Sequence, residues 1–124
     1  MNEKILIIED RADTMNLLKF TLEKQNYAVI SAENGKRGLN ALEKYPIDLV
    51  ILDIMLPDIS GKEILKKIRA DKKYSRVKVI VLTAAKISEK EQKEFFNIGA
   101  QGFLFKPVQI EVMRNEIRKI LEKR

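Results

Sequence analysis

The chain has 124 residues, enough for one domain with its own core, and its 45% apolar and 34% charged residues exclude a disordered or membrane-spanning chain. It contains no Cys and no His, which excludes disulfides, thiolate sites, Ser-His-Asp triads and His-ligated metals. Its net charge of +6 arises within residues 62–78, because the rest of the chain is balanced. Any chemistry must therefore use carboxylates, lysine, hydroxyl groups and a hard metal ion.

Five short apolar runs alternate with stretches of helical periodicity. In chain order, the runs lie at residues 5–8, 28–30, 49–52, 79–82 and 103–105, and the helical stretches at 12–25, 35–44, 61–70, 88–98 and 110–121. The runs are rich in β-branched residues and do not alternate with polar ones, which is typical of strands buried on both faces of a parallel sheet. The order predicts an α/β fold with a five-stranded, doubly wound parallel sheet, in a single domain spanning residues 1–124.

The last two helical stretches carry the clearest local signals. In the fourth, Ser88 is followed three residues later by Glu91, which predicts a capping box, and Gly99 marks the end of the helix. In the fifth, the apolar side chains fall on one stripe that we expect to be buried: Ile110, Met113, Ile117, Ile120 and Leu121.

Residues 62–78 carry eight basic side chains against Glu63 and Asp71. A surface for an acidic protein or a nucleic acid is one interpretation, and a solvated helix face with its following loop is the one we favour. Only Tyr74 interleaves with these charges, so we expect no nucleic-acid partner for this domain alone. The basic residues are Lys62, Lys66, Lys67, Arg69, Lys72, Lys73, Arg76 and Lys78.

Polar side chains follow four of the five predicted strands. Glu9 and Asp10 follow the first, Asp53 the third, Thr83 the fourth and Lys106 the fifth. Taken singly, each is more typical of a turn, a helix cap or the surface. Ligands of open parallel sheets bind beyond the carboxyl ends of the strands, so we expect these side chains to converge there.

Crowded carboxylates repel one another unless a cation joins them. Mg²⁺ suits oxygen ligands of this kind, and a carboxylate nucleophile can accept a phosphoryl group as an aspartyl phosphate. Such a transfer depends on positioning and charge neutralisation more than on acid–base catalysis, so it does not need histidine in this chain.

The motifs in this order resemble the receiver domain of two-component response regulators, over essentially the whole chain. They are Glu9-Asp10, Asp53-Ile-Met-Leu-Pro-Asp-Ile-Ser-Gly61, Thr83-Ala84 and Lys106-Pro107. The resemblance implies a flavodoxin-like sheet with strand order 2-1-3-4-5. It also implies that Asp53 accepts the phosphoryl group and that Asp10 and Asp53 hold Mg²⁺ with the backbone carbonyl of Met55, while Glu9 acts directly or through water.

Further roles are implied by the same resemblance. Lys106 pairs with the phosphoryl group, its bond to Pro107 is cis, and Thr83 hydrogen-bonds a phosphoryl oxygen. Ala84 leaves room for that approach. Phe103 matches the aromatic residue that turns inward when Thr83 moves, although a buried strand Phe is the plainer interpretation.

Three positions depart from common patterns in such domains. The acidic pair is Glu-Asp rather than Asp-Asp, and the longer Glu9 side chain can preserve metal binding. Met55 and Ala85 stand two residues beyond Asp53 and Thr83, where relatives often have polar residues that tune hydrolysis of the aspartyl phosphate. Neither side chain can orient a water molecule, so we predict that neither accelerates dephosphorylation.

The leading hypothesis is a phosphorylation-driven switch rather than a turnover enzyme. A sensor histidine kinase or phosphotransfer protein supplies the phosphoryl group, and a face within residues 86–123 binds an output protein. We expect a monomer, with phosphorylation-dependent dimerisation as a variant of this hypothesis. No apolar stretch approaches the ~18–20 residues of a transmembrane helix and no signal-peptide pattern begins the chain, so we expect a cytoplasmic location and no membrane partner.

Two alternatives remain open. The chain can be a receiver fragment of a larger transcriptional regulator, although Gln101-Gly102 after Gly99-Ala100 argues against one class that carries acidic residues there. It can also be a small Mg²⁺-dependent aspartyl phosphatase, although it lacks the Asp-x-Asp motif of such enzymes after the first strand.

Overall fold

Each predicted apolar run forms a strand in the computed structural model, which describes residues 2–84 and 86–123. The strands are all parallel and lie side by side in the order β2-β1-β3-β4-β5, which confirms the fold class and the strand order. They are β1 (Lys4–Ile8), β2 (Ala28–Ala32), β3 (Leu49–Asp53), β4 (Lys78–Thr83) and β5 (Gly102–Phe105).

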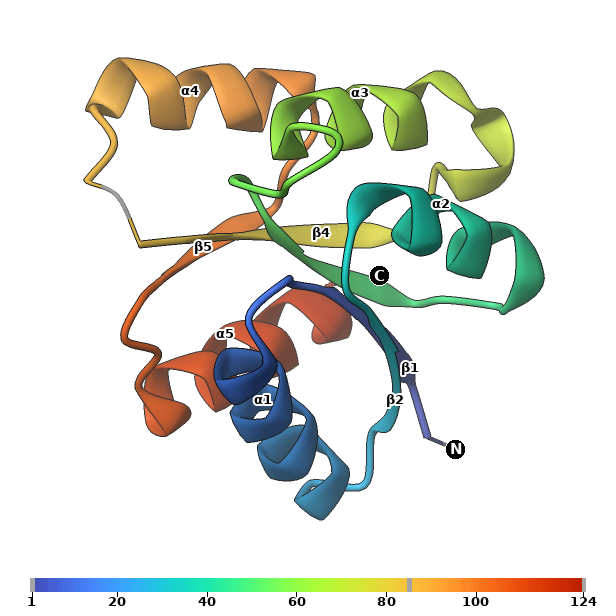
Figure 1. Cartoon of the computed structure of the whole chain (residues 1–124), viewed down its shortest axis with the longest axis vertical. Helices are drawn as coiled ribbons and strands as arrows, with labels where there is room; N and C mark the ends of the chain where they lie inside the picture. Colours follow the sequence, from blue (N-terminus) through green and yellow to red (C-terminus); the bar gives the residue numbers. More distant parts are fainter. Residues whose placement is uncertain (1, 85, 124) are drawn as a thin grey trace.

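In the part of the chain that the structure describes, five α-helices follow the strands and cover both faces of the sheet, with α2, α3 and α4 on one face and α1 and α5 on the other (Figure 1). The predicted caps of α4 are present, because the Ser88 hydroxyl accepts a hydrogen bond from the Glu91 amide and Gly99 ends the helix with a φ of 132°. The helices are α1 (Ala12–Lys24), α2 (Gly35–Lys44), α3 (Gly61–Ala70), α4 (Glu89–Ile98) and α5 (Ile110–Glu122). None of the helices in the described ranges is long and apolar enough to cross a membrane.

Successive strand residues point to opposite faces, and this alternation divides the core into two layers. Leu6 and Ile8 of β1 pack beneath α2 and α3, whereas Ile5 and Ile7 pack against α1 and α5. All residues of β3 are buried, as expected for the central strand of a parallel sheet.

The prediction that every strand is buried on both faces is wrong for the two edge strands, β2 and β5. Residues 28–31 of β2 are partly or fully exposed, and Phe105 of β5 is 49% exposed. An edge strand has a neighbour on one side alone, so the helices cover it incompletely. Ile110 is likewise 44% exposed at the first residue of α5, whereas the other four residues of its predicted stripe are buried.

A short 3-10 helix, η1 (Lys72–Tyr74), follows α3 and was not predicted. The Asp71 carboxylate caps it by accepting a hydrogen bond from the Lys73 amide at 3.1 Å. Three residues are too few for the helical spacing of apolar side chains to be recognised in a sequence.

Arg69 of α3 is not part of a solvated face, although it belongs to the basic segment 62–78. Its guanidinium donates hydrogen bonds to the carbonyl oxygens of Gly99 (3.0 Å), Tyr74 (3.1 Å) and Val77 (2.7 Å). It also donates to the Gln101 side chain, whose oxygen accepts from a β4 amide. One side chain therefore joins the end of α3, the start of β4 and the turn before β5.

Replacing Arg69 with Ala should lower the free energy of unfolding by about 2 kcal/mol, because charged hydrogen bonds to three carbonyls are lost together. Urea denaturation followed by circular dichroism would measure this loss. Lys66→Ala on the exposed side of the same helix serves as the control and should change stability by less than about 0.5 kcal/mol. Equal stability of the two variants would contradict a structural role for the Arg69 hydrogen bonds.

Candidate phosphoacceptor and metal site

The parallel register of the central strands brings the predicted polar side chains to one edge of the sheet. Ile8 at the end of β1 pairs with Leu52, one residue before Asp53, and Asp53 itself pairs with Leu82 of β4. Thr83 pairs with Phe105, the last residue of β5. Residues far apart in the sequence therefore meet where the chain leaves each strand.

Lys106 joins the two buried carboxylates at this edge. Its Nζ lies 2.6 Å from Glu9 Oε1 and 3.0 Å from Asp53 Oδ2. Glu9 and Asp53 are both almost fully buried. The backbone places the lysine here, because the Lys106 amide donates to the Thr83 carbonyl oxygen at 2.8 Å. The Lys106–Pro107 bond is cis, as the resemblance implies.

Burial and the contacts between the charged groups shift the pKa of both Glu9 and Lys106. Burial raises the pKa of Glu9, although Lys106 and the Arg11 amide, which donates to Glu9 Oε2 at 2.9 Å, both favour the ionised form. Burial of Lys106 opposes its charge, but the adjacent Glu9 and Asp53 carboxylates outweigh this effect and raise the pKa of the lysine. The ammonium therefore stays charged and holds the two carboxylates together.

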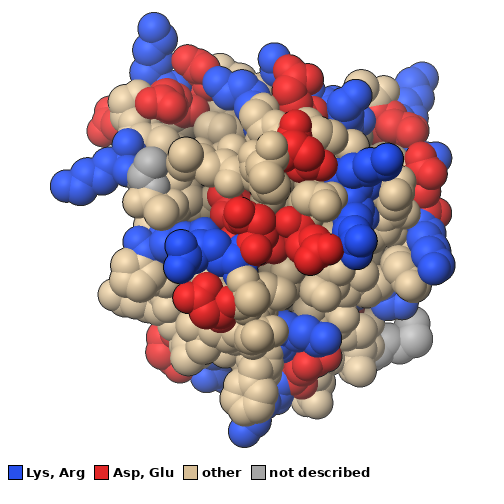
Figure 2. Space-filling model, in the orientation of Figure 1, with Lys and Arg blue, Asp and Glu red and all other residues tan. Residues whose placement is uncertain are grey.

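Three carboxylates can offer oxygens to one cation. One oxygen from each of Glu9, Asp10 and Asp53 lies within 4.8 Å of the others. Glu9 Oε1 is buried without a well-aligned hydrogen-bond donor, so this oxygen keeps capacity to accept. A single lysine cannot balance three carboxylates, and the donor set of hard oxygens fits Mg²⁺. Acidic side chains gather near the ends of β1 and β3 in Figure 2, with basic ones beside them.

The segment after β3 completes this edge. The Met55 amide donates to Asp53 Oδ1 at 2.8 Å, so the backbone of residue 55 lies against the predicted phosphoacceptor. The Met55 side chain is 69% exposed. Because it is an apolar thioether, it places no polar group beside Asp53. Thr83 is buried and Ala84 is exposed, whereas Ala85 lies outside the described residues.

Phe103 lies in an aromatic cluster between β5 and α4. Its ring is edge-on to Phe95 at 5.8 Å and to Phe96 at 5.1 Å between centroids, and it stacks on Phe105 at 6.2 Å. It is partly buried and packs on the core layer beneath α4. Phe96 and Phe105 leave about half of their surface exposed beside it.

Asp58 also contacts the segment around this site, through hydrogen bonds to the first amides of α2. An Asp after Pro between a strand and a helix signals a local turn or cap. Its partners lie more than twenty positions earlier in the chain, and only the packing of α2 against this loop makes them neighbours.

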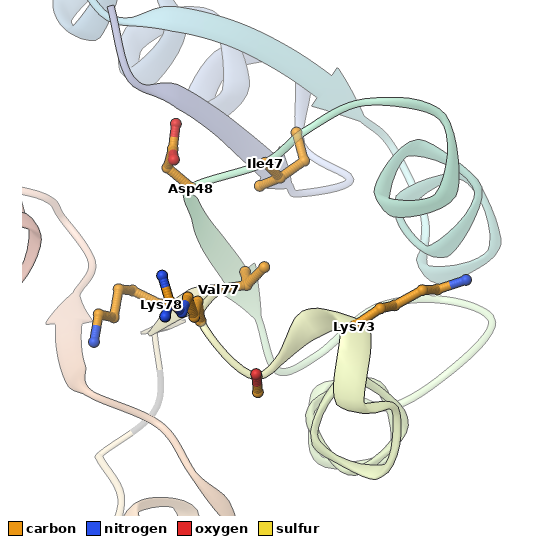
Figure 3. A pocket seen from close by; sticks show the side chains of 7 residues that line it. Ile47, Asp48, Lys73, Val77 and Lys78 are labelled. Carbon is orange, nitrogen blue, oxygen red and sulfur yellow. The ribbon is translucent and has the colours of Figure 1, made fainter. Parts of the chain in front are cut away.

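A cavity of about 680 Å³ lies at the opposite edge of the sheet, between residues 47–48 and the start of β4. Lys73 and Lys78 extend in opposite directions from its two sides, and Asp48 lies across from Val77 (Figure 3). Lys73 and Lys78 therefore do not converge on one carboxylate as Lys106 does with Asp53. A smaller cavity of about 270 Å³ is lined by Glu9 and Asp10 themselves.

Known proteins resemble this chain over nearly its full length. Among curated relatives, the alkaline phosphatase synthesis transcriptional regulatory protein PhoP of Bacillus subtilis is 32% identical over 99% of this chain and 50% of its own. A probable cyclic di-GMP phosphodiesterase of Vibrio cholerae is 36% identical over 95% of this chain and 26% of its own. The chain thus spans half or less of these relatives' length.

Solved structures agree with the fold and with the sequence match. A CheY-like response regulator receiver domain protein of Methanospirillum hungatei superposes with a TM-score of 0.90 at 30% identity, covering 99% of this chain and 96% of that one. Chemotaxis protein CheY4 of Vibrio cholerae gives a TM-score of 0.91 at 26% identity, covering 97% and 99%. The response regulator receiver domain family model matches residues 5–118. The chain therefore belongs to the response regulator receiver domain family, whose members are phosphorylation-based signalling switches.

Proposed function

We propose that Asp53 accepts a phosphoryl group from a sensor histidine kinase or a phosphotransfer protein in a Mg²⁺-dependent reaction. The observation that carries this proposal is the Lys106 ammonium 3.0 Å from Asp53 Oδ2, beside three carboxylates whose oxygens lie within 4.8 Å of one another. A buried acceptor carboxylate with a fixed cation is suited to receive a dianionic group.

Several residues of the chain have separate roles in this phosphoryl transfer. An Asp53 oxygen forms a bond to phosphorus while the donor's phosphorus–nitrogen bond breaks, and the electron pair stays on the donor imidazole. Lys106 and the buried Thr83 hydroxyl bind the phosphoryl oxygens, and Ala84 leaves space for them. Glu9, Asp10, Asp53 and the Met55 carbonyl would hold Mg²⁺, which would supply positive charge against the negative charge that develops on the phosphoryl group.

The new charge on Asp53 then changes the surface formed by α4, β5 and α5. Thr83 is the last residue of β4 and pairs with Phe105 of β5. The Phe103 ring contacts the rings of Phe96 and Phe105. A movement of Thr83 is therefore passed through β5 to these two exposed rings. We infer that this face binds the output protein. We assign residues 1–124 to one receiver domain that works in the cytoplasm as a monomer or as a phosphorylation-dependent dimer.

Incubation with acetyl phosphate and Mg²⁺ tests the proposal directly. Intact-mass spectrometry should detect one added phosphoryl group on the unmodified chain and none on the Asp53→Asn variant. Chelation of Mg²⁺ should also prevent the addition. A phosphoryl group on Asp53→Asn would place the acceptor elsewhere and overturn the assignment.

The length of the relatives favours one extension of this proposal. Transcriptional regulators such as PhoP match this chain over half of their own length, so the same domain can serve within a larger regulator. A regulator of this kind would need the α4–β5–α5 face free for its own output domain. Turnover of a generic phosphate ester would instead favour the small phosphatase.

Replacing Met55 with Asn should shorten the lifetime of the aspartyl phosphate severalfold, because an amide at this position can orient a water molecule and the thioether cannot. The exposed side chain makes this exchange tolerable for folding. The decay of the phosphorylated mass after removal of acetyl phosphate measures the lifetime, with Met55→Leu as the control. An unchanged lifetime in Met55→Asn would refute control of hydrolysis by this position.

A further inference from the structure

The first turn of α2 is capped twice, once locally and once from a distant loop. The Asn34 side chain accepts a hydrogen bond from the Arg37 amide at 2.9 Å, which is an ordinary N-cap. Asp58, in the loop after β3, accepts from the Gly35 amide at 2.8 Å with Oδ1 and from the Lys36 amide at 2.9 Å with Oδ2. The second cap therefore ties two parts of the fold together.

The loop and the helix approach each other closely at this point. A Cβ atom on Gly35 would lie 2.8 Å from Ile64 Cδ1, 3.1 Å from Ile59 Cβ and 3.2 Å from Asp58 Oδ1, so the backbone of the helix start lies close against the loop and against α3. Asp58 Oδ1 also accepts from the Ile59 amide at 2.9 Å, which fixes the orientation of the carboxylate within its own loop. Hydrogen bonds to three amides lower the pKa of Asp58, so it is ionised at neutral pH and faces the positive end of α2.

Hydrogen bonds attach residues 54–60 to several neighbouring parts of the fold. The Ile54 amide donates to the Leu82 carbonyl oxygen of β4 at 3.2 Å, and the Ile54 carbonyl oxygen accepts from the Gly61 amide at 3.2 Å. Asp58 provides the attachment between these ends. The same segment contains Met55, whose amide contacts Asp53 Oδ1 and whose carbonyl is the proposed Mg²⁺ ligand.

We propose that Asp58 is a positioning residue for the metal and phosphoryl site, which holds Met55 in place by fixing residues 54–60 to the start of α2. This proposal rests on the proposed function of Asp53. It predicts that Mg²⁺ binding and the Asp58 hydrogen bonds to α2 strengthen each other, because both hold the same loop in the same position. Mg²⁺ should therefore slow hydrogen exchange of the Gly35 and Lys36 amides.

Asp58→Ala and Asn34→Ala make a matched pair, because each removes one cap from the same helix and only the first releases the loop. Mg²⁺ titration monitored by amide NMR shifts should give an affinity on the order of tenfold weaker for Asp58→Ala, the size of effect typical of residues that orient metal ligands. Asn34→Ala should stay within about twofold of the unmodified chain, because its loop contacts remain. Asp58→Asn keeps an oxygen acceptor for one amide and should lie between them.

Hydrogen exchange of Gly35 and Lys36 with and without Mg²⁺ provides a second measurement that does not depend on phosphorylation. Mg²⁺ should protect both amides in the unmodified chain and in Asn34→Ala, but not in Asp58→Ala. Equal losses of Mg²⁺ affinity in the two alanine variants, or full affinity in Asp58→Ala, would overturn the proposal. If Asp58→Ala does not fold, Asp58→Asn decides by the same criteria. Failure of the unmodified chain to bind Mg²⁺ would instead contradict the function of the site.

Discussion

Replacing Lys106 with Met should lower the free energy of unfolding by about 3 kcal/mol when Mg²⁺ is absent, because removal of one member of a buried ion pair leaves uncompensated charge. Glu9 and Asp53 would then face each other with Asp10 nearby and no cation between them. Met preserves most of the volume of the lysine stem, so the loss reports charge rather than a cavity.

Mg²⁺ should restore most of this stability and should bind Lys106→Met more tightly than the unmodified chain. The ammonium contacts oxygens of two proposed ligands, Glu9 Oε1 and Asp53 Oδ2, and therefore competes with a metal ion for them. Urea denaturation at increasing Mg²⁺ concentration measures both effects, since a ligand of the folded state raises stability with its concentration. Lys66→Met on exposed α3 surface is the control. A loss that Mg²⁺ does not reduce would show that Lys106 contributes packing alone.

Replacing Gly61 with Ala should lower the free energy of unfolding by about 2–3 kcal/mol, the cost of forcing a methyl group into a filled space. The added Cβ would lie 2.5 Å from Ile54 Cα and 2.9 Å from the Asp53 carbonyl oxygen. Both obstacles are backbone atoms, so no side-chain rotation relieves the contact. The segment that carries Met55 must move, and Mg²⁺ affinity should fall together with stability.

Gly102→Ala is the matched control for Gly61→Ala. Its Cβ would meet the ends of two flexible side chains, Glu116 Oε1 and Ile120 Cδ1, both at 3.1 Å, and these can move by a few tenths of an ångström. We expect less than about 1 kcal/mol of destabilisation and unchanged Mg²⁺ affinity. Denaturation and Mg²⁺ titration of both variants provide the comparison. Full metal affinity in Gly61→Ala would show that residues 54–60 do not position the metal site.

Most helices and strands of the fold could be predicted from local sequence patterns. Unbroken apolar runs such as 49–52 can be buried on both faces only in a covered parallel sheet, and this is where β3 lies. The caps of α4 depend on neighbours within a few residues, so Ser88 and Gly99 were identifiable. The strand order came from the resemblance to receiver domains, since alternating strands and helices are compatible with several orders.

Residue order and type predict that acidic groups, a hydroxyl and a lysine leave the strands at the same end of the sheet, because parallel strands have their carboxyl ends on the same side. Contacts between distant segments were needed to show that Lys106 lies between Glu9 and Asp53, that Arg69 binds three carbonyl oxygens and that Asp58 caps a helix earlier in the chain. Tertiary packing also decided that the edge strands stay partly exposed. These features depend on how distant segments pack, and no pattern within one segment contains that information.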